Sequence, residues 1–206
     1  MPATSNILVI TGDIVSSTAL DADRLEACFD ALRLGADRLA SWIKAPVPLT
    51  RHRGDGWQIA LPAASMAPLR AALTMRAALR QTDKAAQSRM ALALGPGEIP
   101  EHGDLNHASG GAFVASGRAL DQLTGSATIA DARGGPQGAA AALADHISSG
   151  WSMAQARSML PMLAPDRPTQ DQVAQDLGIT RQAVRQSLIA AGFPALSLAL
   201  DMLESP

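Results

Sequence analysis

The sequence predicts an α+β fold in which a mixed N-terminal domain is followed by an all-α domain. Over residues 6–94, strand-like and helix-like patterns alternate in the order β-α-β-β-α-β. A glycine-rich segment, 131–138, then interrupts the chain, and every later pattern has helical spacing. We therefore predict two domains, 1–133 and 139–206.

The N-terminal elements follow from their patterns in order. The apolar run 6–11 is typical of a buried central strand, and apolar residues recur at helical spacing over 21–43. "LTRHRGDGWQIAL" (49–61) contains two strand patterns joined by a Gly-Asp-Gly turn, which is typical of a hairpin. A helix over 65–82 and a strand over 88–94 complete the order expected of a ferredoxin-like fold. A further helix and strand are predicted over 111–123 and 126–131.

Composition excludes several classes of protein. The chain has 206 residues, a formal charge of -2 and 47% hydrophobic residues, which argues against disorder and against a general attraction to nucleic acid or membrane. The single cysteine, Cys28, allows no intramolecular disulfide. The sequence shows no signal-peptide pattern and no apolar run near the roughly 18 residues that span a bilayer. We expect a cytoplasmic protein with no membrane partner.

The C-terminal part contains a helix-turn-helix pattern at 168–192. Thr169 and Thr180 are placed to cap two short helices, and Gly178 supplies the turn between them. The pattern resembles the helix-turn-helix of bacterial regulators, whose second helix enters the major groove of DNA. A helical hairpin that binds nothing, or a protein–protein module, remains an alternative.

The second helix of this pattern exposes side chains suited to DNA. Arginine can bond guanine and glutamine can bond adenine, each through two hydrogen bonds. The predicted DNA contacts are Thr180, Arg181, Gln182, Arg185, Gln186 and Gln170. The region from 139 onward has four arginines against six acidic residues, so one copy has little electrostatic affinity for DNA. We therefore expect a homodimer on double-stranded DNA.

The N-terminal part has two aspartates at the ends of predicted strands. "VITGDIVSST" puts Asp13 at the end of the first strand, and "RGDGW" puts Asp55 in the hairpin turn. Asp13 could instead only shape a turn, and Gly-Asp-Gly alone is an ordinary tight hairpin. Together with "ALALGPGEI" and "GGAFVASGRAL", these segments resemble class III nucleotidyl cyclases and their SatD-like relatives over about residues 6–130.

The resemblance implies a site for a metal ion and a nucleotide. It implies Asp13 and Asp55 as metal ligands, with the carbonyl oxygen of Ile14, for Mg²⁺ or Mn²⁺ accompanied by a nucleotide. The residues expected at the nucleotide or its phosphates are Ser16, Ser17, Thr18, Arg51 and Arg118. A chain with no cofactor is the alternative.

The family also places an asparagine, and four residues later an arginine, on the helix after the fourth strand. Ala115 stands at the matching place here, and Arg118 is three residues further on. This departure favours a chain that is not an enzyme, with no catalytic residues, over an active one. We therefore expect a homodimeric DNA-binding transcriptional regulator whose degenerate cyclase-like domain senses a nucleotide or phosphate ligand. The alternatives are an active nucleotidyl cyclase or other metal-dependent phosphoryl-transfer enzyme with a regulatory helical domain, and a pure dimerisation scaffold.

Overall fold

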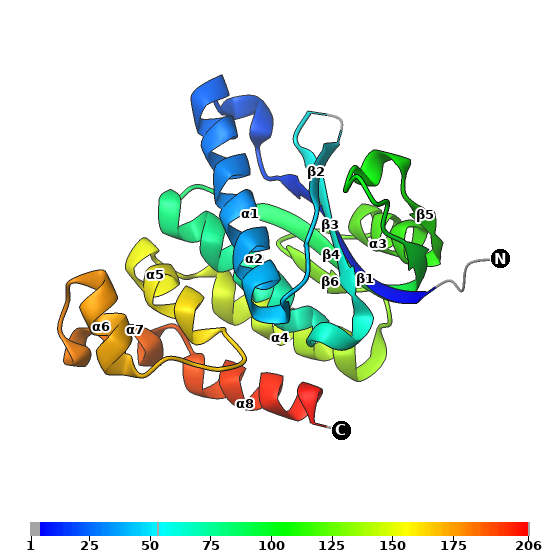
Figure 1. Ribbon diagram of the computed structural model, residues 1–206. Helices are drawn as coiled ribbons and strands as arrows, with labels where there is room; N and C mark the ends of the chain where they lie inside the picture. Colours follow the sequence, from blue (N-terminus) through cyan, green and yellow to red (C-terminus); the bar gives the residue numbers. More distant parts are fainter. Residues whose placement is uncertain (1–4, 53, 206) are drawn as a thin grey trace.

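The computed structural model describes residues 5–52 and 54–205, and it confirms the α+β class. One sheet has the strand order β2–β3–β1–β4–β5, and β6 runs parallel to β4 (Figure 1). Each successive pair in the order β2, β3, β1 and β4 is antiparallel. The strands are β1 (Ser5–Ile14), β2 (Leu49–His52), β3 (Gly56–Pro62), β4 (Ser88–Glu98), β5 (Ser109–Gly110) and β6 (Ile129–Asp131).

The central strand β1 is apolar along its length because both of its faces are covered. Leu8 and Ile10 belong to a hydrophobic cluster that includes residues of α1 (Ala22–Ile43) and α2 (Pro68–Thr82). Ile7 and Val9 point to the other face, where Ala112 of α3 (Gly111–Asp121) packs. A strand buried on both faces reads as a continuous apolar run, as the sequence predicts for 6–11.

Five helices follow the sheet. They are α4 (Gly135–Ser149), α5 (Met153–Met162), α6 (Gln170–Leu177), α7 (Arg181–Ala190) and α8 (Phe193–Glu204). The glycine-rich segment 131–138 is not only a linker. Helix α4 begins inside it at Gly135 and has Pro136 in its first turn. Proline at that position costs no hydrogen bond, since the first N–H groups of a helix have no partner within it.

Helix α2 belongs to two hydrophobic clusters. Met75 and Leu79 pack with the sheet-side core, whereas Leu69 and Leu73 pack with Met159 and other residues of α4 to α8. In Figure 1, α2 accordingly lies between the sheet and α5. The helical region therefore shares part of its core with the N-terminal region, and the boundary between 133 and 139 stays a prediction.

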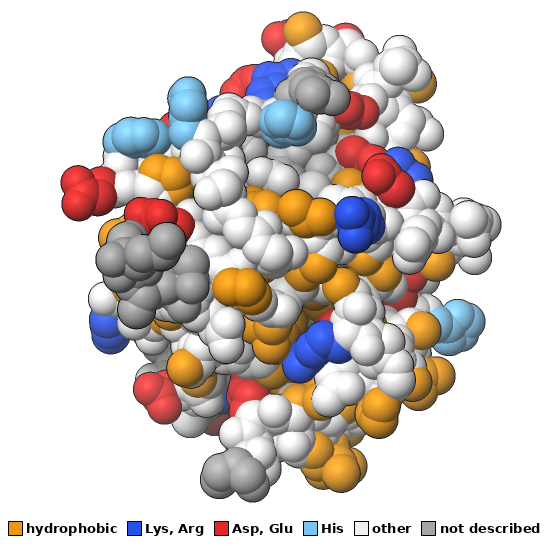
Figure 2. Space-filling view, turned by 90° about the vertical axis from the view of Figure 1, so that its right-hand side faces the viewer, with side chains coloured by type: hydrophobic (Ala, Val, Ile, Leu, Met, Phe, Trp, Pro, Cys, Tyr) orange, Lys and Arg blue, Asp and Glu red, His pale blue; other side chains and the backbone are white. Residues whose placement is uncertain are grey.

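Surface charge is mixed. On the face at the right of Figure 1, where α3 and β5 lie, acidic and basic side chains are interspersed with hydrophobic ones (Figure 2). Within the described residues, no single helix is long and apolar enough to cross a membrane, although α7 and α8, bent by 71°, meet the criteria of length and composition together.

Candidate functional site

Asp13 lies near the end of β1, between two neighbouring strands. It stands opposite Gly56 of β3 and Arg89 of β4. Its backbone carbonyl accepts a hydrogen bond of 2.6 Å from the Ser88 hydroxyl. The preceding residue, Gly12, has no room for a side chain: a Cβ there would lie 2.6 Å from the Trp57 ring and from the Arg89 carbonyl. Close packing on both sides thus fixes the backbone that carries the Asp13 carboxylate.

Asp55 is held in the hairpin turn between β2 and β3. Gly54 before it has φ +83°, a conformation that L side chains rarely adopt. The Asp55 carbonyl accepts a hydrogen bond of 3.2 Å from the N–H of Ile14, just beyond Asp13. The Ser17 hydroxyl donates a hydrogen bond to the Asp55 carboxylate. The turn is therefore tied to the end of β1, which brings the two aspartates together.

Both aspartates line one cavity of about 330 Å³ at this edge of the sheet. His52 and Gln58 contribute polar side chains from β2 and β3, and Asp121 contributes a third carboxylate from the end of α3. Trp57 is fully buried, and its indole N–H donates 2.9 Å to Ser88, so it acts as a packing residue. The cavity is predominantly acidic in its charged groups.

Arg89 is a candidate site residue that the sequence analysis does not identify. Its Nε donates to Asp13 Oδ1 at 2.9 Å, and its terminal nitrogen donates to the other carboxylate oxygen. This hydrogen bonding, together with the nearby charges of Asp121 and Asp55, raises the pKa of the Arg89 guanidinium. The side chain is 42% exposed, so it is free on one side to move. Asp13 thus carries a resident counter-ion.

The donor set at this cavity fits a hard divalent cation. Mg²⁺ in proteins is commonly held by one or two carboxylates, with substrate phosphates and water completing its shell. Asp13 and Asp55 supply two such carboxylates, once Arg89 releases the first. The residues that the structure describes contain no group of three or more His, Cys, Asp or Glu that could hold a metal ion by themselves. The set therefore suits a cation that arrives with a phosphate ligand.

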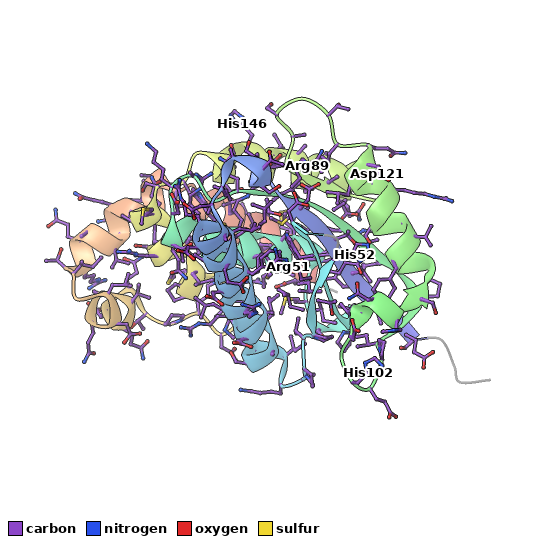
Figure 3. The ribbon with its side chains drawn as sticks, turned by 90° about the horizontal axis from the view of Figure 1, so that it is seen from above. Arg51, His52, Arg89, His102, Asp121 and His146 are labelled. Carbon is purple, nitrogen blue, oxygen red and sulfur yellow. The ribbon has the colours of Figure 1, made fainter. Side chains whose placement is uncertain are left out.

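The other predicted nucleotide residues are divided among different places. Ser17 lies at Asp55, and Ser16 precedes it in a left-handed conformation, φ +55°. Arg51 is turned toward α1, where it pairs with Glu26 at 3.2 Å and lies 4.1 Å over the Phe29 ring. Figure 3 shows Arg51 on the α1 side and Asp121 on α3. The structure therefore places Arg51 outside the cavity of Asp13 and Asp55, and its contact with a nucleotide stays a prediction.

Arg118 is also separated from the two aspartates. With Ala115 it lines a different, open cavity of about 420 Å³ between α3 and β6. Thr18 lies in the short 3₁₀ turn Ser17–Ala19 that leads toward α1. The chain therefore brings Asp13, Asp55 and Ser17 together, and it leaves Arg51 and Arg118 outside their cavity.

The helices of the predicted helix-turn-helix form where expected. Thr169 and Thr180 cap α6 and α7, and Gly178 ends α6 with φ +64°. Of the predicted DNA-contact residues, Gln170 is half-buried at the start of α6, whereas the cap and the first six residues of α7 expose the others, Thr180, Arg181, Gln182, Arg185 and Gln186. Arg181 is 3.6 Å from Asp171, which offsets part of its charge. Contact of these residues with DNA stays a prediction.

Comparison with known proteins adds information on the fold. No family model matches the chain, and no curated protein matches its sequence. Similar solved structures include the guanylate cyclase domain of RhGC from Catenaria anguillulae in complex with GTP, at 20% identity, covering 59% of this chain and 75% of that one, with a TM-score of 0.43. A bacterial light-regulated adenylyl cyclase matches at 16% identity, covering 62% and 75%, with a TM-score of 0.44. The guanylyl cyclase Cya2 matches at 14%, covering 63% and 79%, with a TM-score of 0.40.

These matches correct two expectations. The sequence favours a DNA-binding regulator and a chain that is not an enzyme, whereas the matched structures are cyclase domains, which are enzymes. Both expectations are therefore corrected, because the similar structures are cyclase domains and none of these is a DNA-binding regulator. The expectation rested on Ala115 and Arg118, and these line a cavity apart from Asp13 and Asp55. At identities of 14% to 20% the likeness concerns the fold, and activity depends on the residues of the site.

Proposed function

We propose that this chain is a metal-dependent nucleotidyl cyclase that acts on a nucleoside triphosphate at the cavity of Asp13 and Asp55. One observation supports it above the others: two carboxylates from separate segments line a single cavity and are held there by backbone hydrogen bonds. A structural ion pair needs only one carboxylate for each guanidinium. Here three carboxylates line the cavity and only Asp13 is paired with Arg89, so Asp55 and Asp121 remain as acidic groups for a cation.

The proposed reaction balances without an added oxidant or reductant. The ribose 3′-oxygen forms a bond to the α-phosphorus, the bond from that phosphorus to the β-phosphate oxygen breaks, and pyrophosphate leaves with the electron pair. The hydroxyl proton passes to solvent. A divalent cation held by Asp13 and Asp55 would supply charge neutralisation for the phosphates. Ser17 would keep Asp55 oriented, and Arg89 would leave Asp13 and remain near Asp121 as a cation beside the phosphates.

We further propose that the active form is a homodimer. Arg118 lies in its own groove on α3, away from the two aspartates of its chain. A second copy could present that groove to the first copy's acidic cavity, so that cations and carboxylates from different chains meet. Mixing equal amounts of an inactive Asp13→Asn chain and an inactive Arg118→Ala chain should then restore up to about a quarter of the wild-type activity by random pairing, whereas no recovery would contradict a shared site.

Product identification tests the proposed reaction. The full chain is incubated with ATP or GTP and Mn²⁺ or Mg²⁺, and the nucleotides are separated by chromatography and identified by mass. The proposal predicts a cyclic monophosphate and pyrophosphate in equal amounts. A nucleoside diphosphate with inorganic phosphate would indicate hydrolysis at a different phosphorus, and no conversion of either nucleotide with either metal would overturn the proposal.

A further inference from the structure

Helix α2 contains three buried arginines, and two of them are paired with carboxylates. Arg70 bonds Glu204, and Arg76 lies 2.7 Å from Asp145. Arg80 is only 5% exposed, yet within the described chain no carboxylate lies within 4.0 Å of it. Its terminal nitrogens donate to two backbone carbonyls, those of Lys84 and of Ser149, the latter at 3.0 Å. Arg80 is therefore a buried cation that only neutral groups solvate.

The Nε of Arg80 is also without a hydrogen-bond partner among the residues that the structure describes. A buried donor that is left unpaired costs about 1–3 kcal/mol, and more when it is charged. Asp83, whose charge acts on Arg80, has a side chain that is 40% exposed and is already bonded to Arg24 at 2.8 Å. Burial lowers the pKa of the Arg80 guanidinium, with Asp83 acting in the opposite direction. A compensating ligand at Nε would remove this cost.

A small cavity lies beside this guanidinium. Arg76, Arg80, Gln87 and Thr128 contribute its polar lining, and Leu79 and Met90 contribute apolar walls. Its volume is about 10 Å³, which is room for the centre of one water-sized particle. A phosphate or a carboxylate-bearing metabolite is too large, whereas a monatomic ion or one water fits.

Charge decides between these two occupants. Two guanidinium groups, Arg76 and Arg80, line the cavity, and the single buried carboxylate that bonds either of them is Asp145, on Arg76. Water would satisfy the Arg80 Nε, but it would leave a net positive charge in a region shielded from solvent. We propose that this cavity binds one small monovalent anion of the halide class, chloride in particular, against Arg80.

The anion would stabilise the start of β4, which contacts the end of β1 where Asp13 lies. Gln87 lines the anion cavity, and its carbonyl accepts a hydrogen bond of 2.9 Å from Val15. The next residue, Ser88, also lines the cavity and donates to the Asp13 carbonyl. Occupancy should therefore stabilise the fold where β4 begins, independently of whether the chain turns over a nucleotide.

Thermal unfolding of the full chain in different sodium salts tests this site. We expect Tm to rise with chloride along a saturable curve, by about 3 to 6 °C when chloride exceeds its Kd about tenfold, relative to gluconate at equal ionic strength. Bromide should act similarly. Arg80→Gln should abolish the difference between the salts, and Arg38→Gln, which changes an exposed arginine on α1, should preserve it. A wild-type Tm equal in chloride and gluconate would overturn the proposal.

A direct measurement on the wild-type chain covers the case in which Arg80→Gln does not fold. Crystals grown in sodium bromide should show an anomalous peak beside Arg80, between α2 and the start of β4. A cavity occupied by water, with no anomalous peak at saturating bromide, would contradict the anion site. Neither experiment uses a nucleotide or a divalent metal, so its outcome is independent of the proposed cyclase activity.

Discussion

Arg89 holds both carboxylate oxygens of Asp13, with Nε 2.9 Å from Oδ1, across the register of β1 and β4. The positive charge of Arg89 offsets the negative charge of Asp13, at a cavity that Asp55 and Asp121 also line. A divalent cation that binds Asp13 would therefore compete with Arg89 for this carboxylate. This competition distinguishes the account from one in which Asp13 is only a structural anchor.

Removing the guanidinium should strengthen metal binding. In Arg89→Gln the Asp13 carboxylate loses its positive partner, so we expect Mn²⁺ to bind the cavity up to about fivefold more tightly, because a partly exposed ion pair contributes at most about 1 kcal/mol of competition. Calorimetric titration of Mn²⁺ in the absence of nucleotide measures it. Arg38→Gln is the matched control, since Arg38 is exposed on α1. Equal or weaker binding by Arg89→Gln would show that Asp13 does not receive the cation.

Close packing at Gly12 gives a prediction about stability. Alanine at this position would place a Cβ 2.6 Å from the Trp57 ring, so Gly12→Ala should lower the free energy of unfolding by about 1–3 kcal/mol. Gly117 in α3 has open space around its Cβ direction, and Gly117→Ala should stabilise by about 0.5–1 kcal/mol because alanine favours the helix. Urea unfolding measures both changes, and the same sign for the two variants would contradict the packing described here.

The buried pair of Arg76 and Asp145 gives a pH dependence. Burial by itself would raise the pKa of Asp145, but hydrogen bonds from Thr128 and the charge of Arg76 outweigh it, so the pKa lies below its ordinary 3.8. The fold therefore stabilises the ionised carboxylate. This contribution is complete above about pH 5 and is lost as the pH falls through the folded-state pKa.

Asp145→Asn should accordingly cost about 3–5 kcal/mol of unfolding free energy at pH 7, because Arg76 is left buried without its partner. The difference from wild type should shrink when unfolding is measured below about pH 4. The exposed Asp37→Asn on α1 serves as control and should be close to neutral. A difference between Asp145→Asn and wild type that stays constant from pH 7 to pH 3 would contradict this assignment.

Local patterns predict the elements of this chain well but not the register between strands. The strand 6–11, the hairpin at Gly54 and the helices around Gly178 lie where their patterns place them, because periodicity and turn residues act over a few positions. The pairing of Asp13 with Asp55 follows from the resemblance to class III cyclases, since a strand-end aspartate and a Gly-Asp-Gly turn are each also ordinary turn features. Arg89 was missed because its role depends on standing opposite Asp13, and pairing register is not visible in one strand's sequence.

The same limit explains the position of Arg51. Neighbouring residues of a strand point to opposite faces, so in β2 His52 lines the acidic cavity while Arg51 turns toward α1 and Glu26. If the cyclase pattern is aligned with β2 one residue out of place, the side chain expected in the site lies on the opposite face of the sheet. The burial of the arginines of α2 is likewise not predictable from its sequence, because arginines in a helix usually indicate a solvent-exposed face. Their acidic partners, Asp145 and Glu204, come from α4 and α8, which are distant in the chain.

Initial rates of cyclic product formation by three variants test the central claim most directly. With Mn²⁺ and the better of ATP or GTP, Asp13→Asn and Asp55→Asn should each lower kcat/KM by about 100-fold or more, since even outer partners of metal ligands contribute about 10- to 100-fold. Asp37→Asn should match the wild type. Retention of wild-type rates by either Asp13→Asn or Asp55→Asn, in chains shown to be folded, would contradict an active site at this cavity.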